Sequence, residues 1–451
     1  PLIVLILAVG VFLTIRVKGL QIRLLPRAIK ELFVNEKSGD SGEVSSFAAL
    51  CTALSATIGT GNIVGVATAL VAGGPGALFW MWVAAFVGMA TKYAECLLAV
   101  KYRTVAEDGH IVGGPFYYIE KGMGPKWRWL AKIFAFFGVC VGLFGIGTFT
   151  QINGITNAVQ TFFDPDTTWT VHMFGMDYSW TVVIAGVLLS ICVALVVIGG
   201  IKRISSVSQV VVPFMAVAYV VVVLIILLTH LGEIPGAFRT IIESAFGLRA
   251  AAGGALGAVL IAMQKGIARG IFSNEAGLGS APIAAAAALT DSPGQQGLIS
   301  MLGTFIDTIV ICTMTGLSIV IAGTWNIGLE GVAVTTKAFQ MTLPFPEQLS
   351  SFILMICLVF FAFTTILGWD YYSEKCLEYL SNGNQKVVKG YRWLYILAVF
   401  IGPYMTVSAV WTIADIFNGL MAIPNLIALV ALSGVVVSET KIYLKRIGKA
   451  S

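Results

Sequence analysis

The run Ser-Ala-Thr-Ile-Gly-Thr-Gly-Asn-Ile-Val-Gly at residues 55–65 lies inside an apolar segment of about residues 46–72. A second run, Gln-Lys-Gly-Ile-Ala-Arg-Gly-Ile-Phe-Ser-Asn-Glu-Ala-Gly-Leu-Gly-Ser at residues 264–280, lies inside another apolar segment, about 253–288. Both runs are rich in glycine and polar residues. Glycine is unfavourable in a helix interior and permits non-helical backbone, so each run predicts an interrupted helix.

The composition of the chain predicts a polytopic membrane protein. Of its 451 residues, 57% are hydrophobic and only 11% are charged, whereas soluble domains carry about 25% charged residues. A mean hydropathy of +0.89 over this length indicates that apolar surface meets lipid. The net charge of +5 is spread over short loops, which is typical of membrane topology and not of nucleic-acid binding.

Apolar segments of the length that spans a bilayer, about 20 residues, recur along the chain. We expect eleven transmembrane helices, at residues 1–18, 46–72, 76–100, 130–162, 180–200, 206–230, 253–288, 297–323, 350–378, 393–412 and 415–438.

Basic residues gather in the loops on one side of these segments. This set is Arg23, Arg27, Lys30, Lys37, Lys101, Arg103, Lys121, Lys126, Arg128, Lys202, Arg203, Lys386, Lys389, Arg392, Lys441, Lys445, Arg446 and Lys449. The opposite loops hold only Arg239, Arg249 and Lys337. Because basic loops stay in the cytoplasm, we predict an external N-terminus and a cytoplasmic C-terminus.

An odd number of spans with an external N-terminus suggests one extra helix followed by ten core helices. We expect an N-terminal helix and linker at 1–45, five-helix repeats at 46–230 and 231–440, and a basic tail at 441–451. Five helices invert the orientation of a repeat, and the two glycine-rich runs then open the two halves. Such inverted repeats with broken helices predict a transporter with a site near mid-membrane. Close packing of helices at these glycines is the alternative.

The first break offers both signs of partial charge. The outer half of the helix begins near Thr60, Gly61 and Asn62, and its free N–H groups can hold a carboxylate. The inner half ends near Ser55–Ile58, where unpaired carbonyls suit a monovalent cation. One break therefore predicts an amino-acid site beside a sodium site.

The eighth core helix adds polar and aromatic candidates. Thr364 and Thr365 could complete the cation shell, or each could bond back to its own helix. Trp369 lies four residues after Thr365 on the same face. We expect Trp369 and Phe272 to limit the size of the substrate side chain, with simple packing as the alternative for Trp369.

Other polar residues could reach the cavity from neighbouring helices. Gln151 and Asn153 lie in the expected third core helix, where an interhelical hydrogen bond is the alternative. In the sixth core helix the break could lie at Gln264 or at Ser273–Asn274, and all three residues are candidates for substrate binding.

Charged residues inside the membrane are functional hypotheses because their burial is costly. The candidates are Lys265, Arg269, Glu275, Asp307 and Asp370. Structural pairing of Arg269 with Glu275 or Asp307 is an equal alternative to a role in coupling.

Three further charged residues lie nearer the ends of helices. Lys92 and Glu95 are three residues apart near the expected cytoplasmic end of their helix, which favours a snorkelling pair. Asp415 opens the last expected helix, either as its N-terminal cap or as part of an outer gate.

Nothing in the sequence predicts an enzyme. The seven cysteines are scattered singly, the three histidines fall in or beside loops, and no nucleophile lies beside a base. We therefore expect no cofactor, with sodium as a coupling ion. A membrane enzyme or a receptor would need a catalytic cluster or an appended soluble domain. Oligomeric state is not predicted.

Three motifs carry a family resemblance. The run Gly-Gly-Pro-Gly-Ala-Leu-Phe-Trp-Met-Trp-Val-Ala-Ala-Phe-Val-Gly at residues 73–88 closely resembles the signature of the alanine-or-glycine:cation symporter family. The runs at 56–63 and 272–281 look like the same family, and the resemblance covers essentially the whole chain. It implies a leucine-transporter-type fold in a cell inner or plasma membrane, with alanine or glycine carried inward by a sodium gradient.

The resemblance also implies roles for individual residues. By similarity, residues 59–62 match the broken first helix, with sodium held by the carbonyls of Ser55 and Ile58 and the hydroxyls of Thr364 and Thr365. Asp307 falls where a second cation ligand lies in some relatives, although an aspartate there departs from the usual asparagine. A proton-coupled transporter that uses Asp307, Glu275 or Asp370 is the alternative function.

Overall fold

The computed structural model describes residues 2–33, 42–106, 109–173, 175–247 and 255–448. The loop charges Lys37, Arg249 and Lys449 and the first residues of the expected 253–288 segment lie outside these ranges. Within the described ranges, seven helices are long and apolar enough to cross a membrane. An eighth span results if the bent pair Ser46–Thr57 and Gly61–Gly73 is counted as one. The protein is therefore multi-pass, while eleven spans in a five-plus-five repeat stay a prediction.

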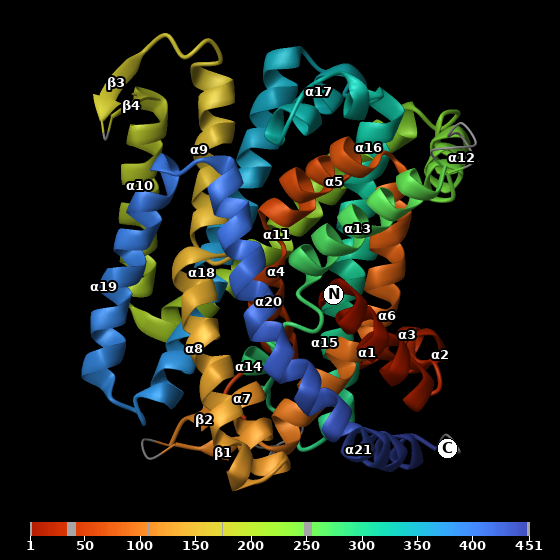
Figure 1. The fold of residues 1–451 in the computed structure, drawn as a ribbon, viewed down its shortest axis with the longest axis vertical. Helices are drawn as coiled ribbons and strands as arrows, with labels where there is room; N and C mark the ends of the chain where they lie inside the picture. Colours follow the sequence, from red (N-terminus) through yellow and green to blue (C-terminus); the bar gives the residue numbers. More distant parts are fainter. Residues whose placement is uncertain (1, 34–41, 107–108, 174, 248–254, 449–451) are drawn as a thin grey trace.

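The chain is mostly helical (Figure 1). Its first half contains α1 (Leu2–Arg16), α2 (Leu20–Arg23), α3 (Leu25–Glu31), α4 (Ser46–Thr57), η1 (Gly61–Gly65), α5 (Val66–Gly73), α6 (Gly76–Lys101), α7 (Pro115–Tyr117), η2 (Tyr118–Gly122), η3 (Pro125–Trp127), α8 (Arg128–Phe144), α9 (Phe149–Phe163), α10 (Trp180–Val197) and α11 (Gly200–Thr229). The remainder contains α12 (Ile234–Ala245), α13 (Ala255–Asn274), α14 (Ala281–Ala285), α15 (Pro293–Thr304), η4 (Phe305–Cys312), α16 (Thr313–Ala322), η5 (Thr324–Asn326), α17 (Val332–Thr342), α18 (Glu347–Leu380), α19 (Gln385–Ile401), η6 (Gly402–Tyr404), α20 (Val407–Ala431) and α21 (Ser433–Arg446).

Two short antiparallel hairpins interrupt the helical pattern, so the all-α prediction is incomplete. Strand β1 (Thr104–Val105) pairs with β2 (Ile111–Val112), and β3 (Thr170–Met173) pairs with β4 (Met176–Ser179). The two hairpins lie at opposite ends of the molecule in Figure 1. Strands of two to four residues lie in connecting loops and contribute no apolar span.

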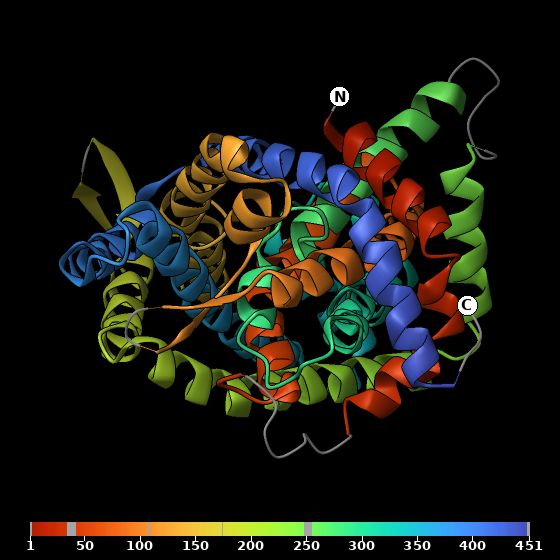
Figure 2. The same ribbon diagram turned by 90° about the horizontal axis from the view of Figure 1, so that it is seen from below.

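The interrupted helices lie in the interior of the bundle. Helices α4, α5 and α13 are central in Figure 1, between a group that contains α8, α10 and α19 and a group that contains α1, α6 and α15. Seen from below, α11 runs along one long edge (Figure 2) and packs against α18 and α4. One large apolar core extends from α1 to α21, so the breaks are enclosed by packed side chains.

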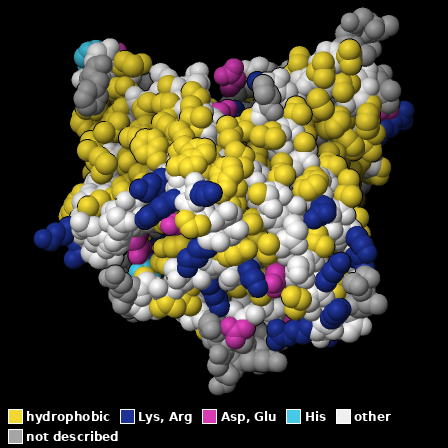
Figure 3. Space-filling model, turned by 60° about the horizontal axis from the view of Figure 1, so that its bottom comes forward, with side chains coloured by type: hydrophobic (Ala, Val, Ile, Leu, Met, Phe, Trp, Pro, Cys, Tyr) yellow, Lys and Arg dark blue, Asp and Glu magenta, His cyan; other side chains and the backbone are white. Residues whose placement is uncertain are grey.

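The surface is divided between apolar and basic regions. Figure 3 shows hydrophobic side chains over the flank of the molecule and Lys and Arg side chains gathered toward the end that Figure 1 draws at the bottom. That end carries the β1–β2 hairpin and α21. The flank has the apolar character expected of a surface that meets lipid.

Two expected boundaries are wrong. The segments 393–412 and 415–438 place a loop near residue 413, but α19 ends at Ile401 and α20 begins at Val407. Gly402–Tyr404 forms the 3-10 segment η6 there, because Pro403 disfavours the continuation of an α-helix. The side chain of Thr406 then caps α20.

The expected helix at 130–162 is also interrupted. Helix α8 ends at Phe144 and α9 begins at Phe149. A Cβ on Gly147 would lie 2.7 Å from the Cβ of Trp369, so the absence of a side chain allows this interruption to approach α18. The interruption therefore brings α9 and its Gln151 toward the interior.

Candidate functional site

The first helix breaks between α4 and the π-helical segment η1, and the two parts are bent by 55°. Ile58 leaves the helical conformation with a ψ of 96°. A Cβ on Gly59 would lie 2.5 Å from Thr365 Oγ1 and 2.8 Å from Gln151 Oε1. Glycine is thus required here because two other helices approach the backbone closely. The predicted position of this break is confirmed.

Backbone donors at this break face side-chain oxygens. The N–H of Thr60 donates to Gln151 Oε1 at 3.0 Å, and the N–H of Gly59 donates to Asn62 Oδ1 at 2.8 Å. Thr60 Oγ1 is buried and has no hydrogen-bond partner among the described residues. Gly61 packs against Phe272 and Ser273 of the other broken helix. Donors of this kind at a helix start suit an anionic group.

The opposite end of the break presents oxygen atoms. Thr365 Oγ1 donates to the carbonyl of Ile58 at 3.1 Å and to that of Phe361 at 3.0 Å. Ser55 is fully buried one turn earlier and packs against Gly368. The structure therefore brings Thr365, Ile58 and Ser55 into one region.

Thr364 is not part of that region, contrary to prediction. Its Oγ1 bonds back to the carbonyls of Phe360 and Phe361 at 3.1 and 3.0 Å and lies 3.3 Å from Met215 Sδ on α11. Successive helical residues differ by about 100° in direction, so adjacent threonines face different neighbours. The sequence alternative in which each threonine bonds to its own helix holds for Thr364 and also for Thr365, which contacts Ile58 in addition.

Asp307 connects the two broken helices. Its Oδ1 accepts hydrogen bonds from Asn62 Nδ2 at 2.6 Å and from Ser273 Oγ at 3.1 Å. Its Oδ2 accepts from Thr308 Oγ1 at 2.7 Å, and Asn274 Nδ2 donates to Thr308 Oγ1 at 3.0 Å. The carboxylate thus belongs to a buried network that contains both helices.

The network includes residues that sequence reasoning missed. Asp307 lies in the π-helical segment η4, where Thr308 supplies a second hydroxyl. Cys312 Sγ lies 3.4 Å from both Asn62 Nδ2 and Ser273 Oγ. A threonine directly after an intramembrane aspartate is a signal that could have identified Thr308, whereas nothing distinguished Cys312 from the other cysteines.

The sixth core helix breaks at residues 275–280, between α13 and α14. This location resolves the sequence alternatives in favour of Ser273–Asn274, which end α13 directly before the break. Gln264 lies ten residues before Asn274, about 15 Å along the helix axis. Gln264 is therefore not at the break itself. It lines a cavity of about 360 Å³ with Arg269 and Asp415, and this cavity reaches Phe272 and Leu278 at the sixth-helix break.

Glu275 starts this break in a left-handed conformation, with a φ of +56°. Trp369 Nε1 donates to Glu275 Oε1 at 2.7 Å, and Ser280 Oγ donates to Oε2 at 2.5 Å. Phe272 packs on Trp411 with ring centroids 4.6 Å apart. Trp369 therefore contacts the sixth-helix break directly, and Phe272 lies one turn before it.

Three expectations about charged residues are wrong. Arg269 pairs with Asp415 at 3.4 Å, not with Glu275 or Asp307. Asp415 lies inside α20 because that helix begins at Val407, so it is not an N-terminal cap. Lys92 and Glu95 do not reach the surface, because α13 and α15 pack along α6 and leave them 2% and 0% exposed.

Asp370 and Asn153, two other predicted residues, differ in their hydrogen bonding. Both carboxylate oxygens of Asp370 are buried and have no hydrogen-bond partner in the part of the chain that the structure describes. Asn153 Nδ2 donates to the carbonyl of Met405 at 3.0 Å, which is the interhelical hydrogen bond considered as an alternative.

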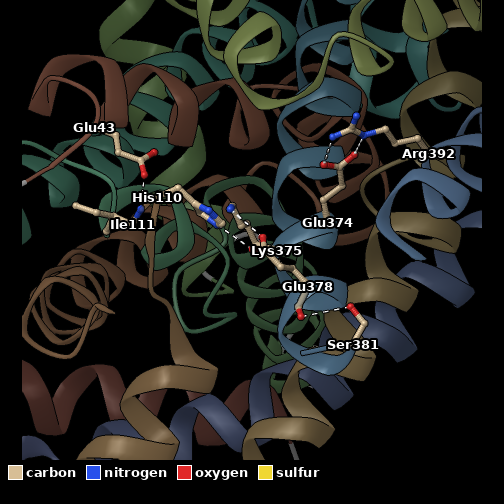
Figure 4. Close-up of polar contacts among 8 residues, drawn as sticks. All are labelled: Glu43, His110, Ile111, Glu374, Lys375, Glu378, Ser381 and Arg392. Atoms are coloured by element: carbon tan, nitrogen blue, oxygen red, sulfur yellow. Dashed lines mark hydrogen bonds and ion pairs between the residues drawn. The ribbon is translucent and has the colours of Figure 1, made fainter. Parts of the chain in front are cut away.

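At the end of the molecule that carries β1–β2, side-chain contacts connect the hairpin to the segment before α4 and to α18 (Figure 4). The Glu43 carboxylate, before α4, accepts a hydrogen bond from the N–H of Ile111 in β2. His110 Nε2 lies 2.8 Å from Glu378 Oε1 of α18, and Lys375 Nζ lies 2.9 Å from Glu378 Oε2. These contacts connect the hairpin to both α4 and α18.

A second set of contacts holds the segment after α14. The Arg103 guanidinium donates to the carbonyls of Ala286, Ala288 and Thr290 at 2.7 to 3.0 Å. The N–H of Leu289 donates to the carbonyl of Val44 at 2.7 Å, which joins the segment before the first broken helix to the segment after the sixth.

Comparisons with known proteins agree with this architecture. The whole chain, residues 1–451, matches the sodium:alanine symporter family. It is 49% identical over 449 residues to the sodium/alanine symporter AgcS of Methanococcus maripaludis, covering 98% of this chain and 94% of that protein. It is 38% identical over 447 residues to the probable sodium/glutamine symporter GlnT of Bacillus subtilis, covering 99% of this chain and 88% of that protein.

A solved structure supports the fold. The crystal structure of MhsT in complex with L-phenylalanine has a TM-score of 0.57 and 13% identity, over 90% of this chain and 99% of that one. The leucine-transporter-type fold expected from the resemblance is confirmed. The protein is thus a membrane transporter and not an enzyme, and the chain belongs to the sodium:alanine symporter family.

Proposed function

We propose that the protein is a sodium-coupled symporter that imports small neutral amino acids, alanine and glycine first, by alternating access. The observation that carries this proposal is the pair of opposite surfaces at one helix break. The N–H of Thr60 points to a side-chain acceptor, while the carbonyl of Ile58 meets the hydroxyl of Thr365. An amino-acid carboxylate suits the first surface and a sodium ion suits the second.

The carboxylate would bind at Thr60, Gly61 and Asn62. The amide oxygen of Gln151 accepts the hydrogen bond from the Thr60 N–H. A carboxylate oxygen of the substrate would replace it as the acceptor. The unpartnered hydroxyl of Thr60 is a further donor for the same group. Ser273 and Asn274, which join the Asp307 network, would complete the site from the sixth core helix.

Sodium would bind between the carbonyls of Ser55 and Ile58 and the hydroxyl of Thr365. The Thr365 and Ile58 oxygens are 3.1 Å apart, close enough for one cation to contact both at the roughly 2.3–2.6 Å typical of hard cations. Each sodium charge moved inward gains about 2.3 kcal/mol per 100 mV of membrane potential, and a concentration gradient adds to it. Thr364 faces Met215 and is not assigned to this shell. Asp307 is assigned to the network between the helices and not to a second sodium.

The size of the substrate would be limited by Phe272 and Trp369, which are 3% and 1% exposed. The relative from Bacillus subtilis is named for glutamine, so side-chain size is the property to test within the family. We expect glutamine to compete weakly with labelled alanine, and Phe272→Ala to improve that competition.

We further propose the five-plus-five inverted repeat with an extra N-terminal helix, an external N-terminus and a cytoplasmic C-terminus. The breaks at 58–60 and 275–280 would be equivalent positions of the two repeats. The basic end in Figure 3 supports the orientation, because basic residues favour the cytoplasmic side.

The test is uptake of labelled alanine by proteoliposomes with and without an inward sodium gradient. We expect accumulation that requires sodium and that unlabelled glycine reduces. Uptake that is equal with and without sodium would overturn the coupling.

A proton-coupled version is the second candidate, and one observation favours it. The buried carboxylate of Asp307 contacts Asn62 and Ser273, so a change in its protonation would alter hydrogen bonds to both broken helices. Uptake driven by a pH step in sodium-free medium, and lost in Asp307→Asn, would support it over the sodium mechanism.

A further inference from the structure

A buried ammonium group without a hydrogen-bond partner lies on α6, the helix that packs along α13. Lys92 is 2% exposed, and its Nζ makes no hydrogen bond to any residue that the structure describes. A buried charge is strongly unfavourable unless opposite charges lie nearby. Lys92 therefore requires carboxylates as neighbours.

Three neighbouring carboxylates come from three elements. Glu95 is on α6, Glu275 begins the sixth-helix break and Asp307 lies in η4. Glu95 lies three residues after Lys92, on the same face of α6. Helix α13, which ends directly before Glu275, and η4 both pack against α6, and all three carboxylates are fully buried. The charge of Lys92 acts on all three of them, so one ammonium is shared by Glu95 and Glu275.

The same two carboxylates hold the unwound segment 275–280. Glu275 accepts hydrogen bonds from Trp369 of α18 and from Ser280 at the far end of the segment. Glu95 Oε1 accepts from Asn425 Nδ2 at 2.6 Å, and that amide also donates to the carbonyl of Gly277 at 2.9 Å. The geometry of the break therefore depends on two carboxylates, one at its first residue and one on α6.

We propose that Lys92 is the resident counter-cation of the sixth-helix break, a positioning residue whose ammonium balances Glu95 and Glu275. It keeps the segment 275–280 in the geometry that transport requires. Its carboxylate neighbours belong to α6, the sixth-helix break and η4, and the Thr60 and Thr365 contacts of the first break do not include it. This inference rests on the proposed transport of alanine, whose own failure would appear as absence of uptake by the unmodified protein.

The test compares Lys92→Met with a charge-balanced double variant in sodium-driven alanine uptake. Lys92→Met leaves two uncompensated carboxylates, so we expect about a tenfold lower maximal rate, with half-saturating alanine within about threefold of the unmodified protein. Adding Glu95→Gln restores the net charge of the cluster. We expect the double variant to regain about fivefold over the single variant.

Lys101→Met is the matched control, because Lys101 is on the same helix but is 43% exposed and pairs with Glu439. We expect its rate to stay within about twofold of the unmodified protein. A Lys92→Met rate that is also within twofold would overturn the proposal. So would a double variant that is folded in detergent but no more active than Lys92→Met.

If the single variant does not accumulate, the double variant decides the question alone. Uptake above about a tenth of the unmodified rate supports charge balance, and a folded but inactive double variant contradicts it.

Discussion

The two helix breaks differ in the chemistry that surrounds them. At the first break, the Thr60 N–H and the Ile58 carbonyl meet uncharged groups, the amide of Gln151 and the hydroxyl of Thr365. This break reaches a carboxylate, that of Asp307, through the side chain of Asn62. The sixth break is bounded by Glu275 and Glu95, which share the charge of Lys92. Neutral partners can exchange with a ligand without leaving a buried charge behind, whereas ionised partners cannot. We infer that the first break exchanges ligands and that the sixth break keeps its partners.

The largest expected effect comes from the residue that touches both breaks. Asp307→Ala removes the carboxylate that accepts from Asn62 and Ser273, although Asn62 Nδ2 keeps the backbone carbonyl of residue 307 at 3.2 Å. We expect about a hundredfold loss of alanine uptake. Asp307→Asn keeps an acceptor and removes the charge, so its loss should be smaller. Uptake by Asp307→Ala above a tenth of the unmodified rate would show that the breaks do not depend on this connection.

The second prediction concerns space at the first break. A Cβ at residue 59 would meet Thr365 Oγ1 at 2.5 Å and Gln151 Oε1 at 2.8 Å, so we expect Gly59→Ala to reduce uptake about thirtyfold. Gly65→Ala is the control, because its Cβ would have Thr60 O at 3.9 Å as its nearest neighbour. Equal effects of the two substitutions would contradict the assignment of the break as the ligand site.

The third prediction separates two adjacent threonines. Thr365 contacts the Ile58 carbonyl and Thr364 does not. We expect Thr365→Ala to raise half-saturating sodium about five- to tenfold, and Thr364→Ala to change it less than about twofold. The measurement is alanine uptake against sodium concentration. The reverse order of effects would move the sodium site to the α11 side of α18.

The smallest effect is expected for a charged residue remote from both breaks. Asp164 precedes the β3–β4 hairpin, where hydrogen bonds from Ser179 and then from Thr168 hold its pKa below the usual value. Because this pKa is lower in the folded protein, the ionised Asp164 stabilises the fold at pH values above the unfolded-state pKa of about 3.9. That contribution to stability is lost as the pH falls through the folded-state pKa.

We therefore expect Asp164→Asn to leave uptake between about pH 6 and pH 8 unchanged, because the Asp164 carboxylate contacts Thr168 and Ser179 and neither break. The variant would lower thermal stability relative to the unmodified protein only where Asp164 is ionised, and the difference would vanish in strong acid. A change in uptake at neutral pH would show that charges outside the breaks also control transport.

Local signals in the sequence account for the parts of the site that were predicted well. Glycine and polar residues inside apolar segments located both breaks, because backbone conformation depends on the residues themselves. Asp307 was identified as a candidate because a charge inside the membrane is energetically costly and therefore indicates a functional role. Thr308, its neighbour in the sequence, was not predicted although its position beside Asp307 was a signal. Cys312 was not predicted because its contacts with Asn62 and Ser273 depend on how three segments meet.

Other features depend on packing that no local pattern contains. Thr364 and Thr365 are equivalent by composition, and only the neighbours of α18 distinguish them. Lys92 and Glu95 resemble a surface pair by spacing, yet α13 and α15 enclose them. The position of Asp415 was misjudged because Gly402–Pro403 was not taken as the helix boundary, although both residues are visible in the sequence.

The π-helical segment η4 has a consequence for the span that contains it. Each residue of an α-helix turns the direction of its side chain by about 100°, and a π-type turn shifts the angular phase of everything that follows. Helix α15 faces α3 and α6 before the shift, and α16 faces α12 and α17 after it. In the span formed by α15, η4 and α16, the face that packs in the first half therefore does not fix the face that packs in the second half. Removing a single residue from η4 would rotate one half against the other without changing any other side chain.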